Sequence, residues 1–232
     1  VARRARPAAP MPATPPAAAV EVAALRLPSA VAIDFAWRRG DRHGAARLEG
    51  RVADGRYELQ LEGRLDDRPA LRWHSQGTVD EQGLAPERFV AQRGRRPAQA
   101  VNFDRELGRV RFSATTAAVP LTPGMQDRLS WLLQLPALVD AEPSLRQAGA
   151  RVRLAMVDVR GEAGPWDFEV RGLEAVDLAD GQSVDALLLV RRSPRPYDTE
   201  VAVWLDPAAG HLPVRLRLST PEGGETAEFL RH

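Results

Sequence analysis

The chain has 232 residues, 44% hydrophobic and 27% charged, which is enough for one well-buried domain or two small ones. Its 32 basic residues nearly balance 31 acidic ones, so a formal charge of +1 provides no global field to attract nucleic acid or an anionic membrane. The sequence contains no cysteine, which excludes disulfides, thiolate metal sites and cysteine nucleophiles.

Residues 1–27 are predicted to be a disordered linker. The stretch VARRARPAAPMPATPPAAAV (1–20) places prolines among alanines without any hydrophobic periodicity. Such a composition favours extended polyproline II structure and buries too little apolar surface to offset the entropy of ordering. Two interpretations stay open, a spacer between a preceding anchor and the folded domain, or simply a disordered end. No run of about 18 apolar residues occurs, so no segment is expected to span a bilayer.

Residues 28–232 are predicted to form a single domain made mainly of β-strands. Apolar and polar residues alternate in VAIDFAW (31–37) and YELQLEGRL (57–65), which is the period of half-buried antiparallel strands. About a dozen such segments, separated by short turn sequences such as ADG (53–55), favour a meander. A long sheet must close or cover its apolar face, so we expect a strongly curved antiparallel sheet, an open or half barrel, wrapped around one main helix.

The one long segment with a helical pattern is GMQDRLSWLLQLPAL (124–138). Thr122 and Pro123 suit an N-cap and a first helical position, and apolar residues then recur at helical spacing. We therefore predict a helix at about 123–135, ended or kinked by Pro136. Its apolar surface is wider than one stripe, so the helix should lie inside the curved sheet. It is either a plain core plug or one wall of an apolar cavity for a ligand.

No constellation of residues for catalysis is found in the sequence. Motifs for nucleotide binding, nucleophile elbows and zinc proteases are absent. The four histidines lack metal-ligand spacing, so we expect neither a metal nor a cofactor. Asp66 and Asp67 are adjacent carboxylates, but within LDDRP they are typical of a turn rather than of an acid/base pair. We expect a protein that is not an enzyme.

The densest basic clusters are RGRR (93–96) and RRSPR (191–195). Each lies at an expected strand end beside glycine or proline, without the interleaved aromatic residues that would indicate stacking on nucleic-acid bases. Such clusters are typical of solvated turns. The alternative is contact with an anionic head group or with a partner protein.

Six segments, in their order and spacing, resemble the bacterial domain-of-unknown-function family 3108, over roughly residues 28–231. They are YELQLEGRL (57–65), GLAPERF (83–89), NFDRELGRVRFS (102–113), LTPGMQDRLSWLLQL (121–135), WDFEVRGLEAV (166–176) and VWLDPAAGHLPVRLRL (203–218). The resemblance implies a periplasmic protein of the Gram-negative envelope, usually with an N-terminal export signal or anchor. This sequence shows neither, so membrane association is expected only through a missing anchor. The resemblance implies no catalytic residues.

The hairpin at 203–218 is also distantly similar to that of the periplasmic lipoprotein carriers and their sensor relatives. Those proteins fold as an incomplete barrel over a helical lid and bind acyl chains. Because a fold does not fix a function, this similarity only suggests the class of ligand.

Together these observations predict a non-enzymatic periplasmic binding protein for a lipid, an acyl chain or another apolar ligand. The alternative is a tethered structural or protein-interaction module of the envelope with no small-molecule ligand. The expected partner is accordingly an apolar ligand or an envelope protein, and not nucleic acid. The candidate ligand-binding residues are Trp37, Trp73, Phe112, Leu129, Trp131, Leu132, Trp166 and Leu216.

Overall fold

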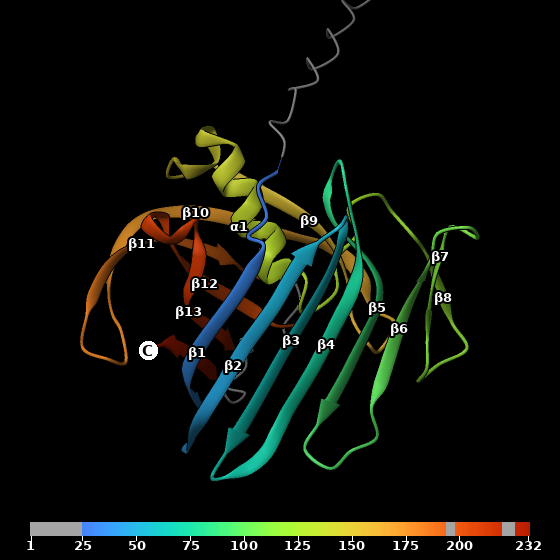
Figure 1. Ribbon diagram of the computed structural model, residues 1–232, viewed down its shortest axis with the longest axis horizontal. Helices are drawn as coiled ribbons and strands as arrows, with labels where there is room; N and C mark the ends of the chain where they lie inside the picture. Colours follow the sequence, from blue (N-terminus) through green and yellow to red (C-terminus); the bar gives the residue numbers. More distant parts are fainter. Residues whose placement is uncertain (1–24, 194–197, 220–225) are drawn as a thin grey trace, which may run out of the picture.

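The computed structural model describes residues 25–193, 198–219 and 226–232 (Figure 1). Most of the predicted linker, residues 1–24, therefore lies outside the described residues. Residues 25–29 precede the first strand, and Leu27 already packs against the hydrophobic core.

Nearly all regular structure in the described residues is β-strand, as the alternating sequence pattern predicts. The strands are β1 (Ala30–Arg39), β2 (Arg42–Ala53), β3 (Arg56–Leu65), β4 (Arg68–Asp80), β5 (Gly83–Arg93), β6 (Gln99–Asp104), β7 (Arg109–Phe112), β8 (Ala118–Pro120), β9 (Arg151–Val157), β10 (Ala163–Asp177), β11 (Ser183–Arg191), β12 (Glu200–Asp206), β13 (Leu212–Ser219) and β14 (Ala227–Arg231). The helical elements are α1 (Trp131–Ala141) and the short 3-10 helices η1 (Pro143–Arg146) and η2 (Pro207–Ala209).

All 14 strands belong to one sheet, in the order β8-β7-β6-β5-β4-β3-β2-β1-β14-β13-β12-β11-β10-β9. Every neighbouring pair of these strands is antiparallel, and most neighbours are consecutive in sequence. Within the described residues β8 and β9 do not pair with each other, so the sheet curves without closing (Figure 1). The predicted fold class, a strongly curved antiparallel sheet wrapped around one main helix, is confirmed.

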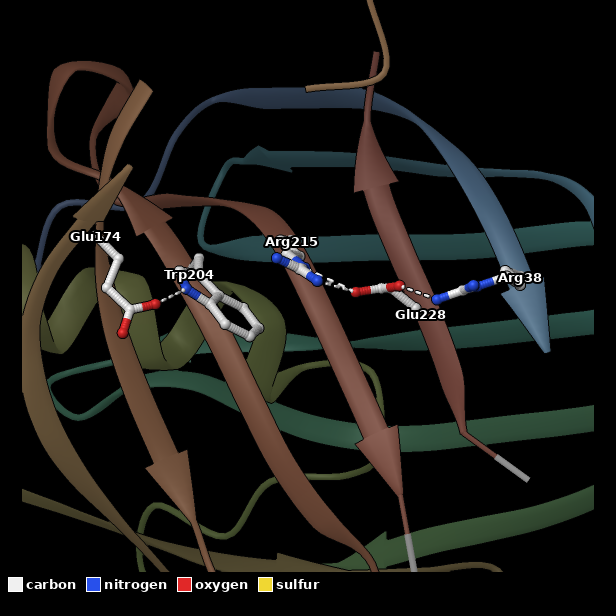
Figure 2. Close-up of polar contacts among 5 residues, drawn as sticks. All are labelled: Arg38, Glu174, Trp204, Arg215 and Glu228. Atoms are coloured by element: carbon white, nitrogen blue, oxygen red, sulfur yellow. Dashed lines mark hydrogen bonds and ion pairs between the residues drawn. The ribbon is translucent and has the colours of Figure 1, made fainter. Parts of the chain in front are cut away.

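The two halves of the sheet meet where β1 pairs with β14, the first strand with the last. On the outer face of this seam, Arg38 of β1 donates a hydrogen bond to Glu228 of β14 at 2.8 Å (Figure 2). Glu228 also accepts from Arg215 of β13 at 2.7 Å. On the same face the indole N–H of Trp204 donates to Glu174 at 2.9 Å. Polar contacts thus link β1, β13 and β14 in addition to the backbone ladder.

Helix α1 begins later and ends later than the predicted range of 123–135. Thr122 and Pro123 start a turn instead, because Met125 N–H bonds to the Thr122 carbonyl and Gly124 adopts a φ of 68°, outside the helical region. Pro136 lies within the helix and does not end it. Its missing N–H falls one turn after the helix start, and the remaining turns are held by burial on several sides.

The turn that leads directly into the helix is closed by a reciprocal pair of side chains, Asp127 and Ser130. The Asp127 carboxylate accepts from the N–H groups of Leu129 at 2.7 Å and Ser130 at 2.9 Å, and Ser130 Oγ accepts from Asp127 N–H at 3.0 Å. This reciprocal arrangement resembles a capping box, but it satisfies N–H groups of the turn that precedes Trp131. The pair therefore fixes the turn from which the helix continues.

The core lies between helix α1 and the concave face of the sheet. Leu129, Leu133, Leu135 and Val139 are at most 1% exposed, so the helical segment is covered on several sides as predicted. Side chains from both halves of the sheet, such as Leu48 and Phe168, belong to the same apolar cluster. Burial of a leucine side chain contributes about 1.5–3 kcal/mol, so this cluster is the main source of stability.

Replacement of Leu129 by alanine tests this account of the core. Leu129 is fully buried, so Leu129→Ala should lower the free energy of unfolding by about 2–5 kcal/mol through lost burial and a new cavity. Leu107 is 62% exposed, and Leu107→Ala is the matched control, with an expected change within about 0.5 kcal/mol. Urea denaturation measures both. Equal effects of the two substitutions would contradict the assignment of the core.

Candidate functional site

A small apolar cavity lies between the start of helix α1 and the concave face of the sheet. Its volume is about 20 Å³, which is room for about one water molecule. The residues that line it are Leu61, Trp73, Arg128, Trp131, Leu132, Trp166, Leu216, Leu218 and Phe229. All but one are apolar or aromatic, and they come from both halves of the sheet as well as from the helix.

Five of the eight predicted ligand-binding residues line this cavity. They are Trp73, Trp131, Leu132, Trp166 and Leu216. The other three, Trp37, Phe112 and Leu129, are buried in the same core cluster but do not line the cavity. Trp37 stacks on the cavity-lining Phe229, with ring centroids 5.2 Å apart. Period-two patterning therefore identified the concave face, but not which part of it the helix leaves uncovered.

Arg128 is the single charged residue of the lining, and sequence reasoning missed it. Its guanidinium lies over the ring of Trp166, 4.7 Å from the centroid, and Arg191 lies 4.6 Å from the same ring. Burial lowers the pKa of Arg128 to about 10, so the group stays protonated at neutral pH. A charge within the apolar stretch GMQDRLSWLLQL was the signal that could have identified it.

Four further arginines belong to the same end of the sheet as the cavity. Because all neighbouring strands are antiparallel, β1, β5, β9 and β11 run in one direction and end together. Arg39, Arg93 and Arg191 are the last residues of β1, β5 and β11, and Arg160 follows β9. Although Arg93 is exposed, partial desolvation and then repulsion from Arg160 and Arg39 lower its pKa, as expected for positive charges at one end of a sheet. We call these four residues the arginine end of the sheet.

Both basic clusters found in the sequence contribute to the arginine end, through Arg93 and Arg191. Arg191 is 4% exposed and forms an ion pair of 2.7 Å with Asp198. Pro194 and Arg195 of the second cluster lie outside the described residues. Arg191 is thus buried rather than part of a solvated turn, whereas Arg93, Arg95 and Arg96 are exposed as a solvated turn predicts.

A buried polar network fixes the start of the helix beside the cavity. Tyr57 and Ser75 hydroxyls are 2.9 Å apart, and Ser75 Oγ donates to Asp127 at 2.6 Å. Asp127 and Ser75 are fully buried. Desolvation raises the pKa of Asp127 to about 6, although hydrogen bonds from Ser75 and from the helix N–H groups act in the opposite direction.

Two further contacts hold helix α1 against the sheet. Gln134 accepts from Leu84 N–H at 2.8 Å and donates to the Gln82 carbonyl at 2.6 Å, which fastens the helix to the β4–β5 turn. Near the other end of the helix, Asp140 lies 3.1 Å from Nδ1 of the buried His211. Polar contacts therefore fix the helix at its start, middle and end.

The remaining sequence candidates for chemistry stay apart in space. Asp66 and Asp67 occupy the β3–β4 turn with positive φ values, as their sequence context predicts. His74 bonds to Glu58 at 2.8 Å on the outer side of the sheet. Among the described residues, no three His, Cys, Asp or Glu side chains gather as metal ligands. In the same part of the chain, no helix is both long and apolar enough to cross a membrane.

Comparisons with known proteins give a family and a fold. The family described as "Protein of unknown function (DUF3108)" matches residues 32–230. The crystal structure of a beta-barrel-like protein of the domain of unknown function DUF1849 from Brucella abortus is similar, with a TM-score of 0.53 and 12% sequence identity. The similarity covers 90% of this chain and 98% of that chain, and at this identity it shows a shared fold alone. No curated protein matches.

The raised pKa of Asp127 predicts how stability depends on pH. The folded protein holds this proton more tightly than the unfolded chain, whose carboxyl titrates near 3.8, so the carboxyl's contribution to stability declines as pH rises from about 4 through about 6. Asp127→Asn keeps a side-chain oxygen for the helix N–H groups and has no charge to desolvate. Relative to the wild type, the variant should gain on the order of 3 kcal/mol in free energy of unfolding between pH 4 and pH 7.

Urea denaturation at several pH values measures this gain. Asp185→Asn, at an exposed carboxylate of β11, is the control and should show no comparable gain. A difference between wild type and Asp127→Asn that does not change with pH would contradict the buried, partly protonated state of Asp127.

Proposed function

The chain belongs to the DUF3108 family, whose function is unknown, and we propose that it is a non-enzymatic binding protein for a lipid, an acyl chain or another apolar ligand. The observation that carries this proposal is the apolar cavity between helix α1 and the concave face of the sheet. Three tryptophans, Trp73, Trp131 and Trp166, line it, and ligand sites of this kind are mostly apolar and concave. Binding of this type requires no proton transfer and no metal.

The cavity must enlarge before it can hold an acyl chain, because its volume of about 20 Å³ is much smaller than a ligand site of several hundred Å³. Helix α1 is held by polar contacts at three points, so its displacement would break several hydrogen bonds. Rotation of cavity-lining side chains breaks none of these contacts. Leu218 is only partly buried, which makes it a place where the lining can open.

Apolar burial sets the expected affinity in this proposal. Each methylene group removed from water contributes about 0.8 kcal/mol, which corresponds to about a fourfold change in the dissociation constant. Affinity for straight-chain ligands should therefore rise with chain length until the enlarged cavity is full. The same dependence would not arise from binding to a polar surface site.

The size of the cavity specifically favours a second candidate function. A volume of about 20 Å³ and a firmly held helix are also what a core without a ligand would show. In that case the domain would be a structural or protein-interaction module of the envelope, and the helix a plain core plug. Ligand binding distinguishes the two candidates, because only the first predicts a saturable apolar site.

We also propose the Gram-negative periplasm as the compartment of this protein. The proposal rests on the envelope proteins that the six sequence segments resemble. An envelope protein then remains the expected partner for the second candidate function.

Substitution of Leu218 by tryptophan tests the binding site. The larger side chain should fill the cavity and reduce the affinity for a fluorescent fatty-acid analogue by at least about tenfold, which corresponds to about two lost methylene contacts. Because Leu218 is partly exposed, the variant should stay folded, as near-UV circular dichroism can check. Leu107 lies in an exposed turn, so Leu107→Trp is the matched control and should leave the affinity unchanged. Absence of saturable binding to wild-type protein would favour the module instead.

A further inference from the structure

We infer that the ligand carries an anionic head group, which Arg128 binds at the edge of the apolar cavity. The ligand class is then an anionic amphiphile, an acyl chain that ends in a negatively charged group. This inference rests on the proposed function. It adds the head group of the ligand, whereas the apolar lining accounts only for the chain.

Arg128 has no counter-ion among the described residues. It forms no ion pair or hydrogen bond there, and its one specific contact is the face of Trp166. A partly buried cation without an ion-pair partner is costly, because the nearby carboxylates offset only part of the desolvation of its charge. A bound anion would offset it with charge-assisted hydrogen bonds, and the planar guanidinium suits a carboxylate or a phosphate.

The two carboxylates close enough to influence Arg128 are those of Asp158 and Asp198, and both are engaged elsewhere. Asp198 pairs with Arg191 at 2.7 Å and accepts from Ser193 at 3.0 Å. Asp158 accepts from the backbone N–H groups of Arg160 at 2.8 Å and Glu162 at 3.1 Å. Both carboxylates favour the charged form of Arg128, but neither forms an ion pair with it among the described residues.

The polar side-chain groups of the residues that line the cavity are hydrogen-bond donors only. Besides Arg128, they include the indole N–H of Trp73, which is buried and has no acceptor among the described residues. A lining of this kind selects a ligand group that accepts hydrogen bonds. A cationic head group would meet Arg128 and the arginine end of the sheet with like charge, which is unfavourable.

Arg128 lies close enough to the aromatic lining for a single ligand to contact both, with its head group at Arg128 and its chain in the cavity. Arg128 is followed within four residues by Trp131 and Leu132, which line the same cavity from the helix. Trp166 contacts both Arg128 and Trp131, and the ring centroids of Trp166 and Trp131 are 5.7 Å apart. A head group at Arg128 thus places an attached chain directly against the aromatic lining.

The test compares decanoate with 1-decanol, which have the same chain length and differ in charge. Each competes with the neutral fluorescent probe N-phenyl-1-naphthylamine for detergent-free wild-type protein at pH 8. Decanoate should bind at least about tenfold more tightly than 1-decanol, because a hydrogen bond to a charged group contributes more than a neutral one. Acetate alone should not displace the probe.

Three variants separate the head group from the chain. Arg128→Gln should remove the preference for decanoate and leave the affinity for 1-decanol unchanged, and Arg128→Lys should retain part of the preference. Arg151→Gln, at an exposed arginine of β9, is the matched control and should behave as wild type. Thermal denaturation should show that Arg128→Gln is folded, because the substitution removes a desolvated charge.

Equal affinity of wild type for decanoate and 1-decanol would overturn the inference and leave the proposed function intact. A preference for decanoate that persists in Arg128→Gln would also overturn it, because another cation would then hold the head group. If neither compound displaces the probe and the probe itself does not bind, the proposed function fails together with the inference.

Discussion

The structure depends on one constraint, that the concave face of a continuous 14-stranded sheet is apolar and has to be covered. A closed barrel would satisfy this with its own side chains, but the sheet is open between β8 and β9 in the described residues. Helix α1 supplies the missing cover. It does so over part of the face only, and the aromatic residues beside its start cover the rest around a small cavity. The open sheet with its internal helix and the cavity therefore have one cause, because helix α1 covers only part of the concave face.

Two neighbouring charged residues at the start of the helix have opposite surroundings. Asp127 is fully buried and satisfied by Ser75 and by the first helix N–H groups, so it fixes the helix in place. Arg128 is one of the residues that line the cavity, and it forms no ion pair with a described residue. One residue thus contributes to structure, whereas the other is the residue to which we assign the head group of the ligand. The arginine end of the sheet adds positive potential on the same side.

The sequence predicts the class of fold better than the details of the site. Period-two patterning is sufficient for the curved antiparallel sheet, and the six segments are sufficient for the family, which is confirmed. Thr122 and Pro123 match a helix cap and so predict too early a start, whereas Asp127 and Ser130 close the turn that leads directly into the helix. The helix covers only part of the concave face, and the residues beyond it line the cavity. Local sequence patterns do not show how far the helix extends over the face. Arg128 joins Arg191 only through the fold, because 63 positions separate them in the sequence.

The most direct measurement is a crystal structure of the protein with a fatty acid brominated at its terminal carbon, in which anomalous scattering locates the bromine. We expect bromine density within the enlarged cavity, against Trp73, Trp131 or Leu216, with the carboxylate at Arg128. Bromine found only on the outer face of the sheet, or an unchanged cavity of about 20 Å³ at saturating ligand, would contradict it.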